Sequence, residues 1–453
     1  MAKQRMDGKG GADRVQVCSD SGTNRTFSGI CFITTVPSLS RERFALLFAV
    51  MLVAASGNTA MQSLMPAIGR QLGVADLWVA IAFSLSAVIW VFAAPYWAHR
   101  ADHRGRRALM RLGLYGFIVS MLICGGVLAA GLAGLLAPMA VFAIFTLGRA
   151  LYGGWGSASP PAVQAYIAAR TEGDERTRYL AAIASSFGLG TIIGPAIAPL
   201  FIFPPLGLSG PLIVFALIGM AVLAAVITRL PDDTPRTGAR GQVVAYPSIG
   251  GVGATGGARS EEEAPTKLRW RDPRVLPWHL IGIAGGHGHA ALLGVIGFLV
   301  IDRLGLSLAE SQHWIAIVLM AGAAASLLAQ WGIIPNLPMT PRQLVIWGSA
   351  LAAVGSAATG LATTMYGLTL GFGLASLGYG LFRPGFTSGA SLAVDLDEQN
   401  AVAGMVTSVN GIAFIAAPAL GVLAYGWWMP LPFLATGVLM LALAVWVQLR
   451  VNG

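Results

Sequence analysis

The chain has 453 residues, of which 55% are hydrophobic and 11% are charged, and its mean hydropathy is +0.69. A soluble globular domain is about 25% charged, so this composition excludes an ordinary soluble fold and indicates lipid as the solvent. The net charge of +9 does not indicate nucleic-acid binding, because the basic residues lie in loops between apolar runs and not on one amphipathic face.

The amino-terminal segment, residues 1–42, is polar, mixed in charge and contains Gly and Ser. We expect a disordered cytoplasmic tail here, since the apolar stretch 29–36 is too short for a signal-peptide core. Cys18 and Cys31 lie in this tail and Cys124 lies in an apolar run, which predicts neither a disulfide framework nor a metal cluster.

The apolar runs are about 20 residues or longer, which favours membrane-spanning helices over the alternating 10-residue strands of a barrel. We predict twelve helices, at 44–66, 77–98, 108–130, 137–160, 178–203, 210–230, 276–301, 311–333, 343–363, 366–389, 400–425 and 430–450. The polar stretch from Pro231 to Pro273 has linker composition and separates the helices six and six. The expected organisation is therefore a bundle at 43–230, a cytoplasmic linker at 231–275 and a second bundle at 276–453.

The positions of Lys and Arg predict the orientation. With both termini in the cytoplasm, only Arg70 and Arg303 lie in outer loops, while Arg149 and Arg383 lie within spans. Every other basic residue is then on the cytoplasmic side, as the positive-inside rule requires. The sequence predicts a multi-pass protein of the inner (plasma) membrane.

A repeat relates the two halves. The fourth span contains Gly154, Gly156 and Pro160, and the tenth contains Gly378, Gly380 and Pro384 with identical spacing. A further proline follows 35 residues later in the first half and 34 later in the second. Two equivalent six-helix bundles with a cavity between them are typical of secondary transporters.

Three motifs carry a family resemblance. The turn between spans two and three reads Asp102-His103-Arg104-Gly105-Arg106-Arg107, the fourth span contains Arg149 and Gly153, and the fifth contains Gly190, Gly194 and Pro195. With these motifs, residues 40–450 resemble the major facilitator superfamily, in its twelve-helix drug–proton antiporter group, which includes tetracycline efflux proteins. The resemblance implies an all-α membrane fold of two pseudo-symmetric bundles. The chain departs from the family pattern at Ala98, His103, Ala198 and Pro199.

The resemblance implies gating roles for several of these residues. In the family, the basic turn holds the two halves in one conformation, which assigns that role to Asp102, Gly105, Arg106 and Arg107. The alternative is that these residues only fix topology. Gly190, Gly194 and Pro195 form a small-residue packing face and a helix break that the family associates with export. The resemblance also implies a gating role for Gly153, which follows Arg149 in the motif of the fourth span. Arg383, near the cytoplasmic end of span ten, is interpreted as gating or structural.

Arg149 is the principal substrate or proton-coupling candidate. A guanidinium at the centre of a membrane helix costs about 2.5–3.5 kcal/mol on insertion scales, so it indicates function by default. The alternative is that it bonds to backbone carbonyls of a neighbouring helix. The family carries its coupling arginine at this place.

None of the 20 Asp and Glu residues lies in the middle of a predicted span. The acids nearest to such a position are Asp76 and Asp302, both near predicted outer ends. This argues against a carrier of lipophilic cations and favours a neutral or anionic substrate. His287 and His289 are then the leading proton candidates, or else polar residues that line a Gly-rich helix. Further candidate cavity residues are Asn58, Gln62, Tyr152 and Asn410.

The interpretation that follows is a monomeric secondary transporter that exports a small organic solute by proton antiport, with no cofactor and no metal. An importer or facilitator of a metabolite or siderophore with the same fold is the alternative. An intramembrane enzyme would need a clustered acid, metal or nucleophile, and the acids are not placed for it. A membrane sensor is a third alternative, but the tail and linker are too simple in composition to resemble signalling domains. The substrate stays open between an antibiotic, a siderophore and a sugar-sized metabolite.

Overall fold

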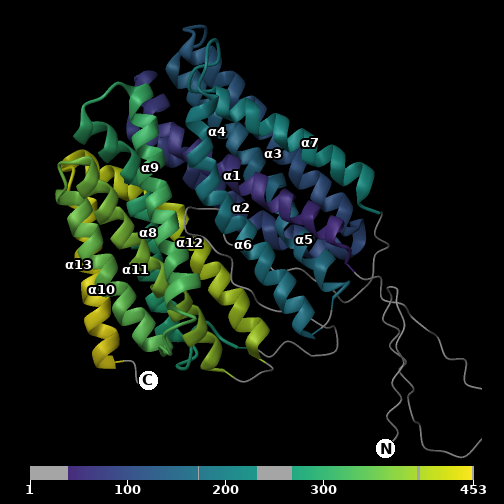
Figure 1. The fold of residues 1–453 in the computed structure, drawn as a ribbon, viewed down its shortest axis with the longest axis vertical. Coiled ribbons are helices and arrows are strands. Elements are labelled where there is room, and N and C mark those ends of the chain that lie inside the picture. The colour runs from purple at the N-terminus through teal and green to yellow at the C-terminus, as the bar shows by residue number, and fades with distance from the viewer. Residues whose placement is uncertain (1–38, 172, 232–267, 395–397, 451–453) are drawn as a thin grey trace, which may run out of the picture.

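The computed structural model describes residues 39–171, 173–231, 268–394 and 398–450, and these form two groups of helices that lie side by side (Figure 1). Most of the expected tail and linker, 1–38 and 232–267, lies outside the described residues. The first group carries the purple-to-teal colours of Figure 1 and the second the green-to-yellow colours. The groups contact each other through α2 against α12, α6 against α9, and α1 against α8 and α9.

The first half contains residues 41–229. Its elements are α1 (Arg41–Gln71), α2 (Asp76–Arg104), α3 (Arg106–Leu132), α4 (Pro138–Trp155), η1 (Gly156–Ala158), α5 (Ser159–Ala168), α6 (Gly173–Ile197), η2 (Ala198–Phe201) and α7 (Gly210–Arg229). The expected fourth span is α4, η1 and α5 together, a helix interrupted by one turn of 3-10 helix. The expected fifth span is α6 continued by η2.

The second half contains residues 276–450. Its elements are α8 (Leu276–Leu304), α9 (Leu308–Leu327), the π-helical η3 (Leu328–Ile333), α10 (Pro341–Leu361), α11 (Met365–Leu392), α12 (Gln399–Trp427) and α13 (Leu431–Arg450). Prolines in the first turn, where a helix leaves its N–H groups unbonded, begin α8 and α10. Capping boxes at Ser307 and Thr340 close the first turns of α9 and α10.

A helix is thus present at each of the twelve expected places, which confirms the all-α membrane fold. In the described part of the chain, ten segments have the length and apolar composition to cross a membrane. The two remaining places are the interrupted α4–α5 segment and α6. Helices suit this setting because each bonds its own backbone polar groups, which lipid cannot do.

The repeat found in the sequence makes equivalent contacts in the two halves. A Cβ on Gly116 of α3 would lie 2.8 Å from the backbone nitrogen of Gly156. A Cβ on Gly348 of α10 would lie 2.7 Å from the carbonyl oxygen of Gly378. In each half, therefore, the repeat glycines let the third and fourth spans pack backbone to backbone, and the halves are pseudo-symmetric.

Most helix boundaries differ from the prediction by up to five residues, and two differ by more. The second span ends at Arg104 and not near 98, so that Gly105, at φ +81°, is the whole connection to α3. The fourth span continues to Ala168 and not to 160. The first extension is polar, so hydropathy alone does not register it as part of a span, and the second begins with a pair of prolines at 160 and 161, which usually mark a helix end. Below, the terminal end is the end of the bundle where α1 begins and α13 ends, and the far end is the opposite one, with the turns 72–75 and 305–307.

Candidate functional site

The Arg149 side chain is fully buried within the first half. Its Nη2 donates to Oδ1 of Asn58 on α1 at 2.8 Å, and its guanidinium carbon lies 5.0 Å from the ring centroids of both Phe83 and Tyr152. An amide oxygen and two aromatic faces stabilise a cation, each aromatic face by about 0.5–2 kcal/mol. Arg149, Asn58 and Tyr152, three residues expected at the site, are therefore brought together.

Close packing of α2 on α4 sets this geometry. A Cβ on Gly153 would lie 2.5 Å from the carbonyl oxygen of Ser86, so only glycine permits the observed approach. The Ser86 hydroxyl donates to the carbonyl oxygen of Arg149 at 2.9 Å. With α2 held this close, Phe83, one turn before Ser86, covers the guanidinium.

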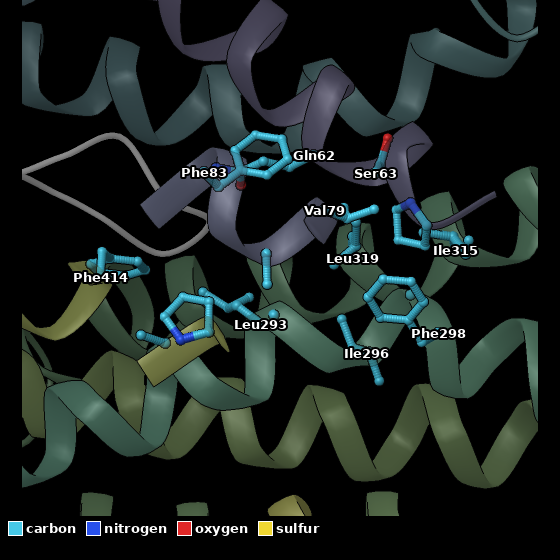
Figure 2. A pocket seen from close by; sticks show the side chains of 16 residues that line it. Gln62, Ser63, Val79, Phe83, Leu293, Ile296, Phe298, Ile315, Leu319 and Phe414 are labelled. Atoms are coloured by element: carbon cyan, nitrogen blue, oxygen red, sulfur yellow. The ribbon is translucent and has the colours of Figure 1, made fainter. Parts of the chain in front are cut away.

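A cavity of about 80 Å³ lies between the two halves, directly beyond Phe83 (Figure 2). Gln62 and Ser63 of α1 and Phe83 of α2 line one side, and Leu293 and Phe298 of α8 face them from the other half. Apart from Gln62 and Ser63, the lining is apolar, and its remaining residues are Pro66, Val79, Ala80, Ala290, Gly294, Ile296, Gly297, Ile315, Leu319, Phe414 and Pro418. This volume holds on the order of five to eight waters, so a whole solute requires the halves to part.

The spacing of residues links other candidates to the cavity. Residues four apart share a helix face, so Asn58 lies one turn from the lining residue Gln62. Asn410 likewise lies one turn from the lining residue Phe414, on the terminal side of it. Asn410 is 9% exposed, and its Nδ2 has no hydrogen-bond partner in the described part of the chain. Arg149 is one side-chain layer behind the cavity wall, since Phe83 separates it from the space.

The two histidines lie in α8 but are not among the residues that line the cavity. Nδ1 of His287 is 2.7 Å from the carbonyl oxygen of Ile283, one turn earlier in the same helix. The ring of His289 stacks on Tyr379 of α11, with centroids 4.3 Å apart and planes 20° apart. Arg383 follows Tyr379 by one turn on the same helix, α11. These side chains form a separate polar group inside the second half.

The glycines of α6 lie directly against α1. A Cβ on Gly190 would be 2.6 Å from Cβ of Ala55, and one on Gly194 would be 2.2 Å from the carbonyl oxygen of Ser56. Pro195 lies inside α6, which changes to 3-10 geometry after Ile197. The α6 backbone therefore supports the same α1 helix that carries Asn58 and Gln62.

The basic turn joins α2 to α3 at the terminal end. Gly105 adopts the left-handed region that favours glycine, and Arg106 is buried. Nη2 of Arg107 donates to the carbonyl oxygen of Ile227, near the end of α7 in the same half. The side chain of Asp102 lies outside the described residues.

A cluster at the far end was not predicted. Arg70 of α1 donates from Nε to Oδ1 of Asp76 at 3.1 Å and from Nη2 to Oδ2 of Asp76 at 2.7 Å. Nη2 also donates to Oδ2 of Asp302 at 2.9 Å, and Nη1 contacts Oδ1 of Asp302. The Tyr425 hydroxyl donates to Oδ2 of Asp302 at 2.5 Å. We call Arg70, Asp76, Asp302 and Tyr425 the far-end cluster.

The sequence did contain a signal for this cluster. Arg70 is one of the two basic residues that break the positive-inside pattern, and Asp76 and Asp302 are the acids closest to lying within spans. The sequence does not indicate that Arg70 pairs with Asp302, because these residues are 232 positions apart and belong to different halves. Within the described ranges, no group of three or more His, Cys, Asp or Glu side chains could hold a metal ion.

Comparison with known proteins agrees with this architecture. Residues 46–340 match the model of the Major Facilitator Superfamily. The staphyloferrin B transporter of Staphylococcus aureus is 27% identical over 165 residues, which are 35% of this chain and 36% of that relative. The matched region thus spans about a third of the relative's length.

Solved structures show the same fold. The nucleoside transporter NupG superimposes with a TM-score of 0.68 at 10% identity, over 90% of this chain and 100% of that one. The human organic anion transporter MFSD10 gives 0.61 at 16% identity, again over 90% and 100%. A bacterial homologue of the human lysosomal transporter Spinster gives 0.66 at 11% identity, over 90% and 95%. With the family match extending over more than half of the chain, this protein belongs to the major facilitator superfamily and is a membrane transporter, not an enzyme.

Proposed function

We propose that this protein exports a small organic solute across the inner (plasma) membrane by proton antiport, with alternating access of one central cavity. The termini and the terminal end are then cytoplasmic, and the far end faces outside, as the placement of Lys and Arg supports. The Gly190, Gly194 and Pro195 packing against α1 supports export, through the family resemblance of that motif. A stretch of the chain resembles a staphyloferrin B transporter, so a siderophore is one of the substrate classes considered.

The observation that carries the proposal is the cavity between the halves with Arg149 one layer behind its wall. Phenyl rings of Phe83, Phe298 and Phe414 offer flat apolar faces, and Gln62 offers an amide that can both donate and accept. Such a lining suits a solute with a planar apolar part and a few polar groups. The fixed charge of Arg149 favours a neutral or anionic solute over a cation.

A facilitator or importer of the same fold is the second candidate. The specific observation in its favour is the absence of Asp and Glu from the middle of the spans, since a mid-span acid is a common carrier of exchangeable protons. A facilitator needs no such acid. The two candidates differ in whether transport depends on a proton gradient.

The test is transport by the full chain in inverted vesicles. A proton gradient is imposed, a panel of anionic, neutral and cationic fluorescent compounds is offered, and lumenal pH is recorded together with uptake. Antiport predicts that an anionic or neutral compound drives proton release from the lumen. Uptake that is unchanged after the gradient is collapsed would favour the facilitator, and a response to lipophilic cations alone would contradict the substrate class.

Variants assign the site within the same assay. Arg149→Lys keeps the charge but loses the fork that reaches Asn58, and it should reduce transport at least about tenfold if that bond contributes the 1.4 kcal/mol that a tenfold change represents. Arg450→Gln removes an exposed arginine at the end of α13 and is the matched control. Equal rates for the two variants would remove Arg149 from the site. Membrane content of each variant is measured by quantitative blotting before rates are compared.

A further inference from the structure

A second cavity lies between the two halves at the far end, with a volume of about 560 Å³. Most of its lining comes from the first half, from the ends of α1 and α3 and from the segment between η2 and α7. Leu308 and Ala309, at the start of α9, line it from the second half. We call this space the far-end cavity, and the space of about 80 Å³ that Phe83 lines the central cavity.

The far-end cavity has the same chemical character as the central cavity. Its lining is apolar apart from the amide of Gln71, just as the central lining is apolar apart from Gln62 and Ser63. The lining residues Gln71, Ala133 and Ala309 are exposed, so the space is reached from outside. Small-molecule sites have volumes of about 300–1,000 Å³. The far-end cavity therefore has room for a whole small solute, which the central cavity lacks in this arrangement of the halves.

Two helices pass from one cavity to the other. On α1, Pro66 lines the central cavity and Gln71 lines the far-end cavity; on α9, the corresponding residues are Ile315 and Ala309. A rise of about 1.5 Å per residue places these lining positions about 8–9 Å apart along each helix. A solute that leaves the central cavity toward the far end therefore reaches the far-end cavity after moving less than two helical turns.

Gln312 of α9 lies between the two cavities. It is three residues from both Ala309 and Ile315, so it shares one helix face with lining residues of both cavities. The side chain is 2% exposed, and its Nε2 has no hydrogen-bond partner in the described part of the chain. The hydroxyl of the preceding Ser311, by contrast, donates to the carbonyl oxygen of Ser307 at 3.0 Å. A buried N–H group that is left unbonded destabilises a protein, so this amide indicates a ligand that accepts hydrogen bonds.

We propose that the far-end cavity is a second binding site for the transported solute, and that Gln312 donates from Nε2 to an oxygen of the solute as it passes between the two cavities. This inference rests on the function proposed above, because its occupant is the transported solute. It narrows the substrate class to compounds that combine a planar apolar part with a carbonyl or carboxylate oxygen. Side chains such as Leu132 and Leu206 contact the planar part, and Gln71 adds a second amide to the lining.

The experiment maps where a photoreactive aryl carboxylate binds the full chain in lipid nanodiscs. The probe is para-benzoylbenzoate, which combines aryl rings, a carboxylate and a ketone that inserts into nearby C–H bonds under near-ultraviolet light. Modified peptides are identified by mass spectrometry over a series of probe concentrations. The expected result is saturable modification of segments that line the far-end cavity, at 129–133, 202–208 or 308–309.

Gln312→Leu replaces the amide with an apolar side chain of similar size. It should lower modification at the far end about tenfold, as the loss of one hydrogen bond to a charged oxygen does. The thermal unfolding temperature should stay the same or rise, because no buried N–H group is then left unbonded. A structural role for Gln312 predicts the opposite pattern, a lower unfolding temperature with unchanged modification, and that result would remove Gln312 from the site.

Two tryptophan variants test the cavity itself. Ala133→Trp adds a large side chain to the lining and should abolish modification at the far end. Leu135→Trp is the matched control, because Leu135 is 76% exposed and does not line the cavity, and it should leave modification unchanged. This pair tests the site even if Gln312→Leu fails to fold. Modification at the wild-type level in both variants would exclude binding in the far-end cavity.

The outcomes separate this inference from the proposed function. Transport in vesicles without saturable modification at the far end would overturn the second site and leave the proposed function intact. No transport of any compound would contradict the proposed function, whereas modification that is lost in Gln312→Leu and Ala133→Trp would still support a binding site. A photoreactive phosphatidylglycerol that modifies the same segments and excludes the carboxylate probe would assign the cavity to lipid and overturn the inference.

Discussion

The bond between Arg149 and Asn58 offers a direct test of how the buried charge is stabilised. Both side chains are fully buried, and they connect α4 to α1 through the 2.8 Å contact between Nη2 and Oδ1. Asn58→Ala removes the acceptor, and Arg149→Lys removes the planar donor while the charge is kept. The contacts of α1 with α6 do not involve either change.

The magnitude follows from the type of bond. A hydrogen bond to a charged group contributes about 1.5–3 kcal/mol to stability. Each single variant loses this contribution, and the double variant loses it only once. The double-mutant cycle should therefore give a coupling energy of more than about 1 kcal/mol between the two positions, since residues in direct contact are not additive.

The assay is unfolding in mixed detergent micelles, with helical content as the signal and identical micelle composition for every protein. A second cycle that pairs Asn58→Ala with Arg450→Gln is the control, because Arg450 is exposed at the end of α13 and should be additive within about 0.5 kcal/mol. If the cycle between Asn58 and Arg149 were additive to the same degree, Asn58 would not stabilise the guanidinium. The 2.8 Å contact would then contribute nothing measurable to the stability of the protein.

Two further predictions concern packing and pH. Gly194→Val should destabilise the protein by about 1–3 kcal/mol, because its Cβ would overlap the Ser56 carbonyl; Gly126→Val, where no atom lies within 4 Å, should have little effect in the same thermal unfolding assay. Hydrogen bonds from Arg274 lower the pKa of Asp272 at the terminal end, so the stability that this carboxylate adds is present at neutral pH and is lost as the pH falls through that lowered pKa. The stability difference between wild type and Asp272→Asn should therefore be constant from pH 5 to pH 7 and shrink only below about pH 3.9, the usual aspartate value; shrinkage already near pH 5 would contradict it.

Much of the fold could be predicted because lipid imposes a simple rule on sequence. Each span must be long and apolar, so the twelve places were recognisable, and the repeat around Gly154 and Gly378 identified the two halves. The error at the end of the second span has a physical cause: residues 98–104 form a helix that continues α2 past its apolar part, and hydropathy does not register polar helix.

The candidate site was less accessible from sequence. Arg149 and Asn58 stood out because polar residues are rare in spans, and the structure brings them together. Phe83, Phe298 and Phe414 carry no such signal, because sequence alone cannot distinguish a phenylalanine that lines a cavity from one that faces lipid. The far-end cluster depended on contacts between halves, which no local pattern encodes.

The contact between Pro66 and Gly297 has a consequence for the cell that houses this protein. A transporter that conducts ions through the closed junction between its two halves would dissipate the membrane gradient continuously, even when no solute is present. At this junction the backbone of α8 approaches the proline ring so closely that a single added methyl group would not fit. The absence of a side chain at position 297 therefore lets the two halves meet here in direct contact, which leaves less room at this point for a continuous file of water along which protons could leak.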